Sequence, residues 1–133
     1  MKALSIQEPW AALIAAGVKS IETRSWRTAY RGPLYIHASR AKVDQKDPHI
    51  QRLLSLLPEG SLHPGFVVCR CVLKDCLPMD ESFLGWIEAH PLEKLCGEYA
   101  PGRFAWVLEQ VEPLEAPVAA KGHLSLWEWE PPP

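Results

Sequence analysis

The period with which apolar side chains recur changes several times along the first part of the chain, and each change predicts an element. Residues 2–6 alternate between apolar and polar and predict a short strand, whereas residues 9–16 carry apolar side chains at helical spacing. Pro9 suits the first turn of that helix, and Gly17 suits the left-handed residue that ends one. From residue 20 to residue 26 the period returns to two, which predicts a second strand.

Four side chains at this helix-to-strand corner are candidates for a binding site. Lys19 stands at the entrance of the second strand, and Glu22, Arg24 and Trp26 fall on one side of it. Two cations, an anion and an aromatic ring grouped in this way suit contact with a phosphate and a base together. The alternative interpretation is a solvated face with a weak ion pair worth roughly 0–1 kcal/mol. The spacing by itself leaves both interpretations open.

The rest of the pattern indicates short strands separated by many turns. It predicts strands over residues 34–38, 65–77, 103–111 and 121–129, helices from Asp47-Pro48 to Pro58 and over residues 80–89, and a loop over residues 90–102 that closes over a site. The apolar stripe of the 48–58 helix is interpreted as core packing, as are Trp10, Trp106 and Trp127.

Nearly the whole chain resembles the ASCH family, which is related to the PUA-like β-barrels. The runs that carry the resemblance are SIQEPWAALIAAGVKSIETRSW, RGPLYIHAS, GFVVCRCVLKDC and FAWVLEQVEPLEAPVAAKGHLSLWEW. Its most specific element is the glycine-x-lysine-x-x-glutamate-x-arginine core, which reads Gly17, Lys19, Glu22 and Arg24 here. The pattern and the resemblance together predict an α+β fold, a small PUA-like mixed β-barrel of five or six strands with two or three flanking helices. A closed sheet of this kind leaves no exposed edge.

Composition narrows the classes of protein that fit. With 133 residues, 47% of them hydrophobic, the chain can bury one sizeable core, so residues 1–130 are expected to form a single domain followed by a proline tail at 131–133. No apolar run approaches the roughly 18 residues of a membrane span, and the start MKALSIQEPW lacks the apolar centre of a signal peptide. We therefore expect a cytoplasmic protein with no membrane partner. Nothing in the pattern specifies an oligomeric state.

The charge balance excludes a broadly basic surface that coats nucleic acid. The formal net charge is −2 and the isoelectric point is near 6.2, so any nucleic-acid binding has to come from a local patch. The candidates for such a patch, which also suit ordinary surface charge, are Lys19, Arg24, Arg27, Arg31, Arg40 and Lys42.

The cysteines and histidines do not predict a metal site or a cofactor. The thiols of residues 69, 71, 76 and 96 are scattered through apolar segments without the paired spacing of zinc ligands, so reduced core cysteines are expected. The histidines at positions 49, 63, 90 and 123 are explained by turns. His37 lies on the mixed polar face of its strand and is interpreted as a structural histidine, with a place in the cleft as the alternative.

The resemblance implies a cleft at the barrel rim that binds RNA or a nucleotide. We expect it to be lined by Lys19, Glu22, Arg24 and Trp26 on one side and by Tyr99, Arg103 and Lys121 from later in the chain. Arg24 would bind a phosphate, and Trp26 and Tyr99 would stack on a base, although large rings fill cores at least as often.

Two other functions remain as alternatives. Some relatives resembling the family are small amidohydrolases on acetylated cytidine and others are ribonucleases; in such an enzyme Lys19 would polarise a carbonyl and Glu22 would activate water. Against that role, Lys19 beside a carboxylate keeps its proton, and in the amidohydrolase-like relatives the position of Glu22 is a threonine. The third possibility is a protein-interaction adaptor.

Overall fold

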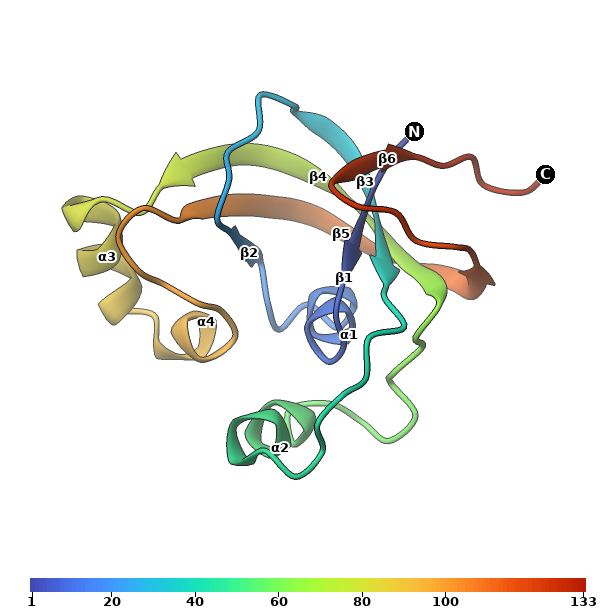
Figure 1. Ribbon diagram of the computed structural model, residues 1–133, viewed down its shortest axis with the longest axis horizontal. Coiled ribbons are helices and arrows are strands. Elements are labelled where there is room, and N and C mark those ends of the chain that lie inside the picture. The colour runs from blue at the N-terminus through green and yellow to red at the C-terminus, as the bar shows by residue number, and fades with distance from the viewer.

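The fold is a strongly curled six-stranded sheet with four helices around it (Figure 1). The computed structural model describes all 133 residues. The strands are β1 (Lys2–Ile6), β2 (Ile21–Arg24), β3 (Gly32–Ala38), β4 (Phe66–Pro78), β5 (Phe104–Ala119) and β6 (Leu126–Glu128). The helices are α1 (Trp10–Ala15), α2 (Pro48–Leu54), α3 (Glu81–Glu88) and α4 (Pro91–Leu95). The predicted α+β fold with a mixed, barrel-like sheet is confirmed.

The sheet curls into a half-barrel and does not close. Its strand order is β2-β5-β4-β3-β1-β6, with β1 and β3 parallel and every other pair antiparallel. The outer strands, β2 and β6, are only four and three residues long, and they do not pair with each other. The expectation of a sheet without exposed edges is therefore wrong. The open side lies between β2 and the end of the sheet that carries β1 and β6.

The prediction for β5 was too short, because prolines interrupt its pattern. The strand continues from Val111 through Pro113 and Pro117 to Ala119. β4 pairs with one side of β5 as far as Ala119, whereas on the other side β2 pairs only with residues 104–107. The later part of β5 therefore has one free edge. A proline, which has no N–H, breaks no ladder hydrogen bond on that edge. The long β4–β5 ladder contains three register shifts, which bend both strands around the core.

Two further predictions are corrected near the site. The expected loop at residues 90–102 contains α4, which begins at Pro91 because proline is tolerated in the first turn of a helix. The expected strand 121–129 pairs with β1 only over Leu126–Glu128, and the residues before it cross the end of the sheet as an irregular strap. α4 is the fourth helix, where two or three were expected.

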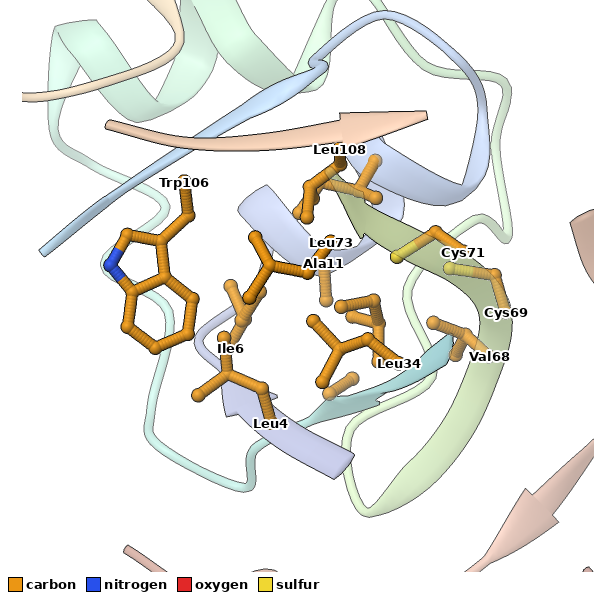
Figure 2. Packing of buried hydrophobic residues seen from close by; sticks show 13 residues of the cluster. Leu4, Ile6, Ala11, Leu34, Val68, Cys69, Cys71, Leu73, Trp106 and Leu108 are labelled. Atoms are coloured by element: carbon orange, nitrogen blue, oxygen red, sulfur yellow. The ribbon is translucent and has the colours of Figure 1, made fainter. Parts of the chain in front are cut away.

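The main core fills the concave side of the sheet, with α1 packed into it (Figure 2). Ala11 and Ile14 of α1 meet Leu34 of β3, Leu73 of β4 and Trp106 of β5 in one buried cluster. The buried positions of Trp106 and Trp127 confirm their assignment to the core. None of the helices has the length and apolar character needed to cross a lipid bilayer.

The four cysteines are not in disulfides, and three of them are buried. Cys69 and Cys71 lie in the main core, where burial raises the pKa of both thiols, that of Cys71 to about 12. No group of three or more histidine, cysteine, aspartate or glutamate side chains is placed to hold a metal ion.

A buried carboxylate that the pattern did not single out holds α1 in place. Glu8 is completely buried, and its two oxygens accept hydrogen bonds from the backbone N–H of Ala12, at 2.8 Å, and of His63, at 2.9 Å. The second contact reaches across the chain to the segment that precedes β4. Desolvation raises the pKa of the Glu8 carboxyl above its usual value of 4.5.

Glu8 should therefore make stability depend on pH. Because its pKa is raised in the folded state, the unfolded chain releases the proton first, and folding is penalised as the pH rises from about 4.5 through the folded pKa. Compared with wild type, Glu8→Gln should show a smaller fall in the free energy of unfolding over this range, measured by urea denaturation at several pH values. Glu59→Gln, at an exposed position, is the control and should leave the pH profile unchanged. Identical profiles for wild type and Glu8→Gln would contradict the assignment.

Candidate functional site

A polar cavity of about 670 Å³ opens on the unclosed side of the half-barrel, between the end of β1 and β2. Its lining comes from six segments of the chain: Ser5, Ile6 and Gln7; Trp10; Lys19 and residues 22–26; His49; residues 96–98; and Arg103. We call this cavity the cleft. Lys19, Glu22, Arg24, Trp26 and Arg103, five of the residues expected at one site, all line it.

The turn after α1 places Lys19 at the base of the cleft. Gly17 has a φ of +78°, the left-handed conformation expected of it, and the N–H groups of residues 18 and 19 both donate to the carbonyl of Leu13. This tight end to the helix turns the Lys19 side chain inward, where only 1% of its surface is exposed. Its Nζ donates to the carbonyl of Cys96 at 2.7 Å and lies 3.7 Å from Oε1 of Glu22.

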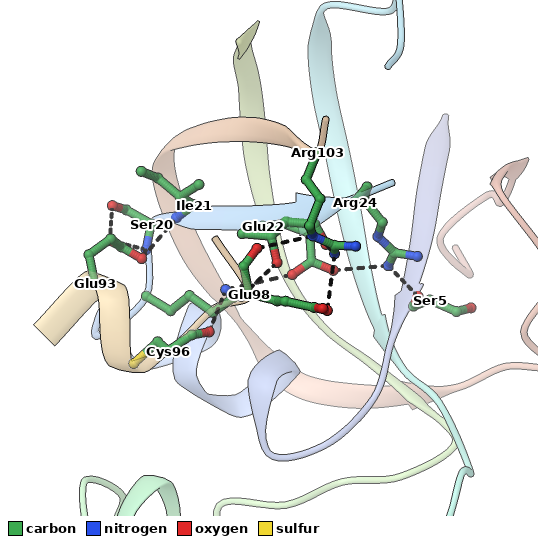
Figure 3. A network of polar contacts seen from close by, with 11 residues as sticks. Ser5, Ser20, Ile21, Glu22, Arg24, Glu93, Cys96, Glu98 and Arg103 are labelled. Atoms are coloured by element: carbon green, nitrogen blue, oxygen red, sulfur yellow. Dashed lines mark hydrogen bonds and ion pairs between the residues drawn. The ribbon is translucent and has the colours of Figure 1, made fainter. Parts of the chain in front are cut away.

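Glu22 links the two cations of the motif (Figure 3). The carboxylate is buried, with Lys19 beside one oxygen and Nη2 of Arg24 at 3.0 Å from the other. Arg24 Nη2 also donates to the carbonyl of Ser5 on β1, at 3.0 Å. This side chain connects β2 to β1 across the side where the sheet has no backbone ladder.

α4 holds the first residues of β2 and so supports the motif from outside. The carboxylate of Glu93 accepts hydrogen bonds from the N–H and hydroxyl of Ser20 and from the N–H of Ile21, at 2.6–3.3 Å. Just beyond α4, Cys96 presents the carbonyl that receives Lys19. The segment predicted as a loop therefore closes one side of the cleft through a helix and its C-terminal carbonyl.

Arg103 forms another part of the wall. Its Nη2 donates to the carbonyl of Thr23 at 3.3 Å and lies 3.5 Å from Oε2 of Glu98, and its Nε donates to the Glu98 carbonyl. The Arg103 side chain remains 22% exposed. It is thus fixed in direction while keeping surface available to the cavity.

Two tryptophans line the cleft. Trp26 is half-buried and meets Trp106 edge to face, with ring centroids 4.7 Å apart. Its carbonyl accepts a hydrogen bond from the Trp106 indole, so the core fixes its backbone. Trp10 was assigned to the core outright, but it is only half-buried and also lines the cleft from the first turn of α1. Its place beside the motif in the sequence was the signal for this role.

Tyr99 and Lys121, which were expected in the same cleft, do not line it. The ring of Tyr99 stacks on Phe83 of α3, with centroids 6.0 Å apart, and desolvation raises the pKa of its buried hydroxyl. Lys121 lies on the strap that crosses the end of the sheet, where it lines a second cavity together with His37. His49, explained by a turn in the sequence, lines the cleft from the first turn of α2.

The predicted basic patch is divided among several places. Lys19 and Arg24 are in the cleft, Arg40 lines the second cavity, and Arg27 and Arg31 line a smaller pocket elsewhere. Any electrostatic attraction at the cleft therefore comes from the cations of its own lining.

The contacts of the cleft suit it to bind an anionic, partly aromatic ligand. Lys19 and both oxygens of Glu22 are engaged with one another and with the protein, whereas Arg24 uses only Nη2 in these contacts. Its Nε is buried with no hydrogen-bond partner. The other terminal nitrogen, Nη1, makes no hydrogen bond within the protein, so a guanidinium held at Nη2 keeps this donor for a planar or tetrahedral anion.

Comparisons with known proteins place this site in a family. The sequence profile of the ASCH domain matches residues 4–118, which include the whole motif. Activating signal cointegrator 1 of human and of mouse are 37% and 36% identical to this chain in alignments 81 residues long, which cover 56% of this chain. The chain spans only 14% of the length of either relative. The crystal structure of an ASCH protein from Zymomonas mobilis shares the fold, with a TM-score of 0.61, 16% identity, and coverage of 97% of this chain and 87% of that one.

Removing the charge of Glu22 should destabilise the whole fold. Glu22→Gln leaves Lys19 and Arg24 without the anion they share, and breaking a buried ion pair costs about 3–5 kcal/mol. The measurement is the free energy of unfolding from urea denaturation. Glu98→Gln is the matched control, because Glu98 pairs with Arg103 at an exposed position, where a loss below about 1 kcal/mol is expected. Equal losses in the two variants would mean that Glu22 is not the centre of the network.

Proposed function

The chain belongs to the ASCH domain family, and from this premise we propose that it is an RNA-binding module whose cleft binds one nucleotide of a single-stranded RNA. In this proposal Arg24 contacts the phosphate and the tryptophans of the lining contact the base. The observation that carries it is the state of Arg24, which Glu22 and the Ser5 carbonyl hold at one nitrogen only.

Preorganisation of Arg24 supports binding of a phosphate. The side chain already lies across the open side of the half-barrel, 24% exposed, so a ligand does not have to order it. Arginine donors of fixed direction match the oxygens of a phosphate in pairs. Arg103, held by Thr23 and Glu98, supplies a second cation next to the strand that carries Arg24.

The aromatic lining supports a nucleotide over a bare anion. Trp10 and Trp26 are both half-buried and both line the cleft. Stacking of a base on such a ring contributes roughly 1–3 kcal/mol and tolerates any base. A single strand exposes the faces of its bases, whereas a duplex hides them.

The hydrolase alternative receives less support from the contacts. A general base has to reach water, but both oxygens of Glu22 are already paired with cations and the carboxylate is buried. Lys19, the proposed electrophile, is 1% exposed and donates to the Cys96 carbonyl. Both groups therefore serve mainly to position Arg24.

The proposal is tested by measuring the affinity for a labelled single-stranded RNA by fluorescence anisotropy at several KCl concentrations from about 50 to 300 mM. Arg24→Ala should weaken binding and reduce the slope of log affinity against log salt by about 0.7, the value for one phosphate contact on a single strand. Trp26→Ala should weaken binding by roughly 5–150-fold without changing that slope, because stacking releases no counterion.

Arg70→Ala is the matched control, since Arg70 is exposed on β4 outside the cleft and should leave affinity within about twofold. Arg24→Lys keeps the positive charge if the alanine variant proves unstable, and it should bind more weakly than wild type because the fork of donors is lost. Wild-type affinity in Arg24→Ala would refute the cleft. Mass analysis of modified nucleosides and RNA after incubation distinguishes the hydrolase, which alone would give products.

A further inference from the structure

A second cavity, of about 790 Å³, lies beside the cleft at the ends of β1 and β3. Its far wall is the strap, residues 119–124, which joins β5 to β6. The charged or titratable side chains of its lining are Arg40, Lys121, His37 and His123, and no carboxylate is among them. The chain as a whole has a net charge of −2, whereas every charged or titratable side chain in the lining of this cavity is basic.

A chain of hydrogen bonds fixes the inner wall of this cavity. The Trp127 indole N–H donates to Ser5 Oγ at 3.2 Å, and Ser5 Oγ lies 2.9 Å from Nδ1 of His37. His37 Nε2 lies 2.8 Å from the carbonyl of Ala120. A carbonyl only accepts, so Nε2 carries a proton. Burial lowers the pKa of His37, which favours the neutral ring, and Nδ1 of a neutral ring protonated at Nε2 accepts from the Ser5 hydroxyl. His37 thus ties the strap to the sheet.

Close packing keeps the strap in this position. A Cβ on Gly122 would lie 2.7 Å from Ser5 Oγ and 2.8 Å from Cε1 of His37, so only glycine lets the backbone approach β1 and β3 this closely. The neighbours of Gly122 in the sequence, Lys121 and His123, are exposed and belong to the same lining. A rigid backbone thus carries two basic side chains into the mouth of the cavity.

Nothing within the protein neutralises the two permanent cations. Neither Arg40 nor Lys121 has an acidic group within 4.0 Å, whereas Lys19, Arg24 and Arg103 of the cleft each have one. Basic side chains that converge on a cavity without acidic partners favour an anion of matching size, and a phosphate oxygen accepts from both arginine and lysine.

Ser5 is the one residue that lines both cavities. Its carbonyl accepts from Arg24 on the cleft side, and its hydroxyl contacts His37 on the other side. The two cavities are therefore adjacent, one on each side of Ser5.

We propose that the second cavity binds a neighbouring phosphate of the same RNA strand, through Arg40 and Lys121. This inference rests on the proposed function, and it extends the binding site from one nucleotide to a short stretch of backbone. It assigns to Lys121 a phosphate contact at a place separate from Lys19 and Arg24.

The test uses two probes, inorganic phosphate and hexauridylate, and one double variant, Arg40→Gln with Lys121→Gln. Titration of the wild-type chain with inorganic phosphate at constant ionic strength should shift the backbone amide NMR signals of Gly122 and His123 saturably, and the double variant should not respond. Hexauridylate should bind the double variant about tenfold more weakly, with the salt slope reduced by about 0.7–1.4.

The matched control is Lys46→Gln with Arg70→Gln, which removes the same charge from two exposed positions without ion pairs outside both cavities. It should keep hexauridylate affinity within about threefold of wild type. Equal hexauridylate affinities in the two double variants would overturn the inference, as would amide signals of Gly122 and His123 that do not shift with phosphate. Neither result would contradict the proposed binding of a nucleotide in the cleft. A failure of the proposed function gives a different result, because the wild-type chain would then bind no hexauridylate. That result would also overturn the proposed RNA contact in the second cavity.

Discussion

The carboxylate of Glu22, buried between Lys19 and Arg24, is the interaction on which the arrangement of the site depends. Through Lys19 it is connected to the segment that follows α4, and through Arg24 to the Ser5 carbonyl at the end of β1. A buried anion requires compensation, and here the compensation comes from residues that tie three separate segments together. The motif therefore acts as a structural junction first, and its chemistry follows from what this junction leaves exposed.

The open side of the half-barrel leaves room for the cleft and for the second cavity beside it. In a closed barrel, backbone ladders would occupy the space between β2 and the β1 end of the sheet. Here the side chain of Arg24 crosses that space, and cavities lie on both sides of the wall formed by Ser5. The outer strands β2 and β6 are short, and the strap packs closely on β1 and β3 at Gly122. Both features limit the length of unpaired backbone that these ends of the open sheet expose.

The site and the scaffold solve the problem of buried charge in different ways. Glu8 is buried with backbone N–H groups as its only hydrogen-bond partners, and desolvation raises its pKa although these hydrogen bonds lower it. Glu22 is buried with two cations, one of which, Arg24, reaches the cleft. The first arrangement only positions α1 and the segment before β4. The second positions a guanidinium in the lining of the cleft, so this chain of net charge −2 carries a local positive group there.

Local features of the sequence determined the first helix, the left-handed Gly17, the positions of most strands along the chain and the grouping of Lys19, Glu22 and Arg24. These features depend on period and backbone conformation over a few residues. Only the tertiary structure decided that the sheet stays open, that α4 supplies a carbonyl to Lys19, and that Lys121 belongs to a different cavity. These outcomes depend on contacts between distant segments, such as Lys19 with Cys96, 77 residues apart, and Ser5 with Gly122 of the strap, 117 residues apart (122 − 5). Spacing along one segment carries no information about where a distant segment crosses it.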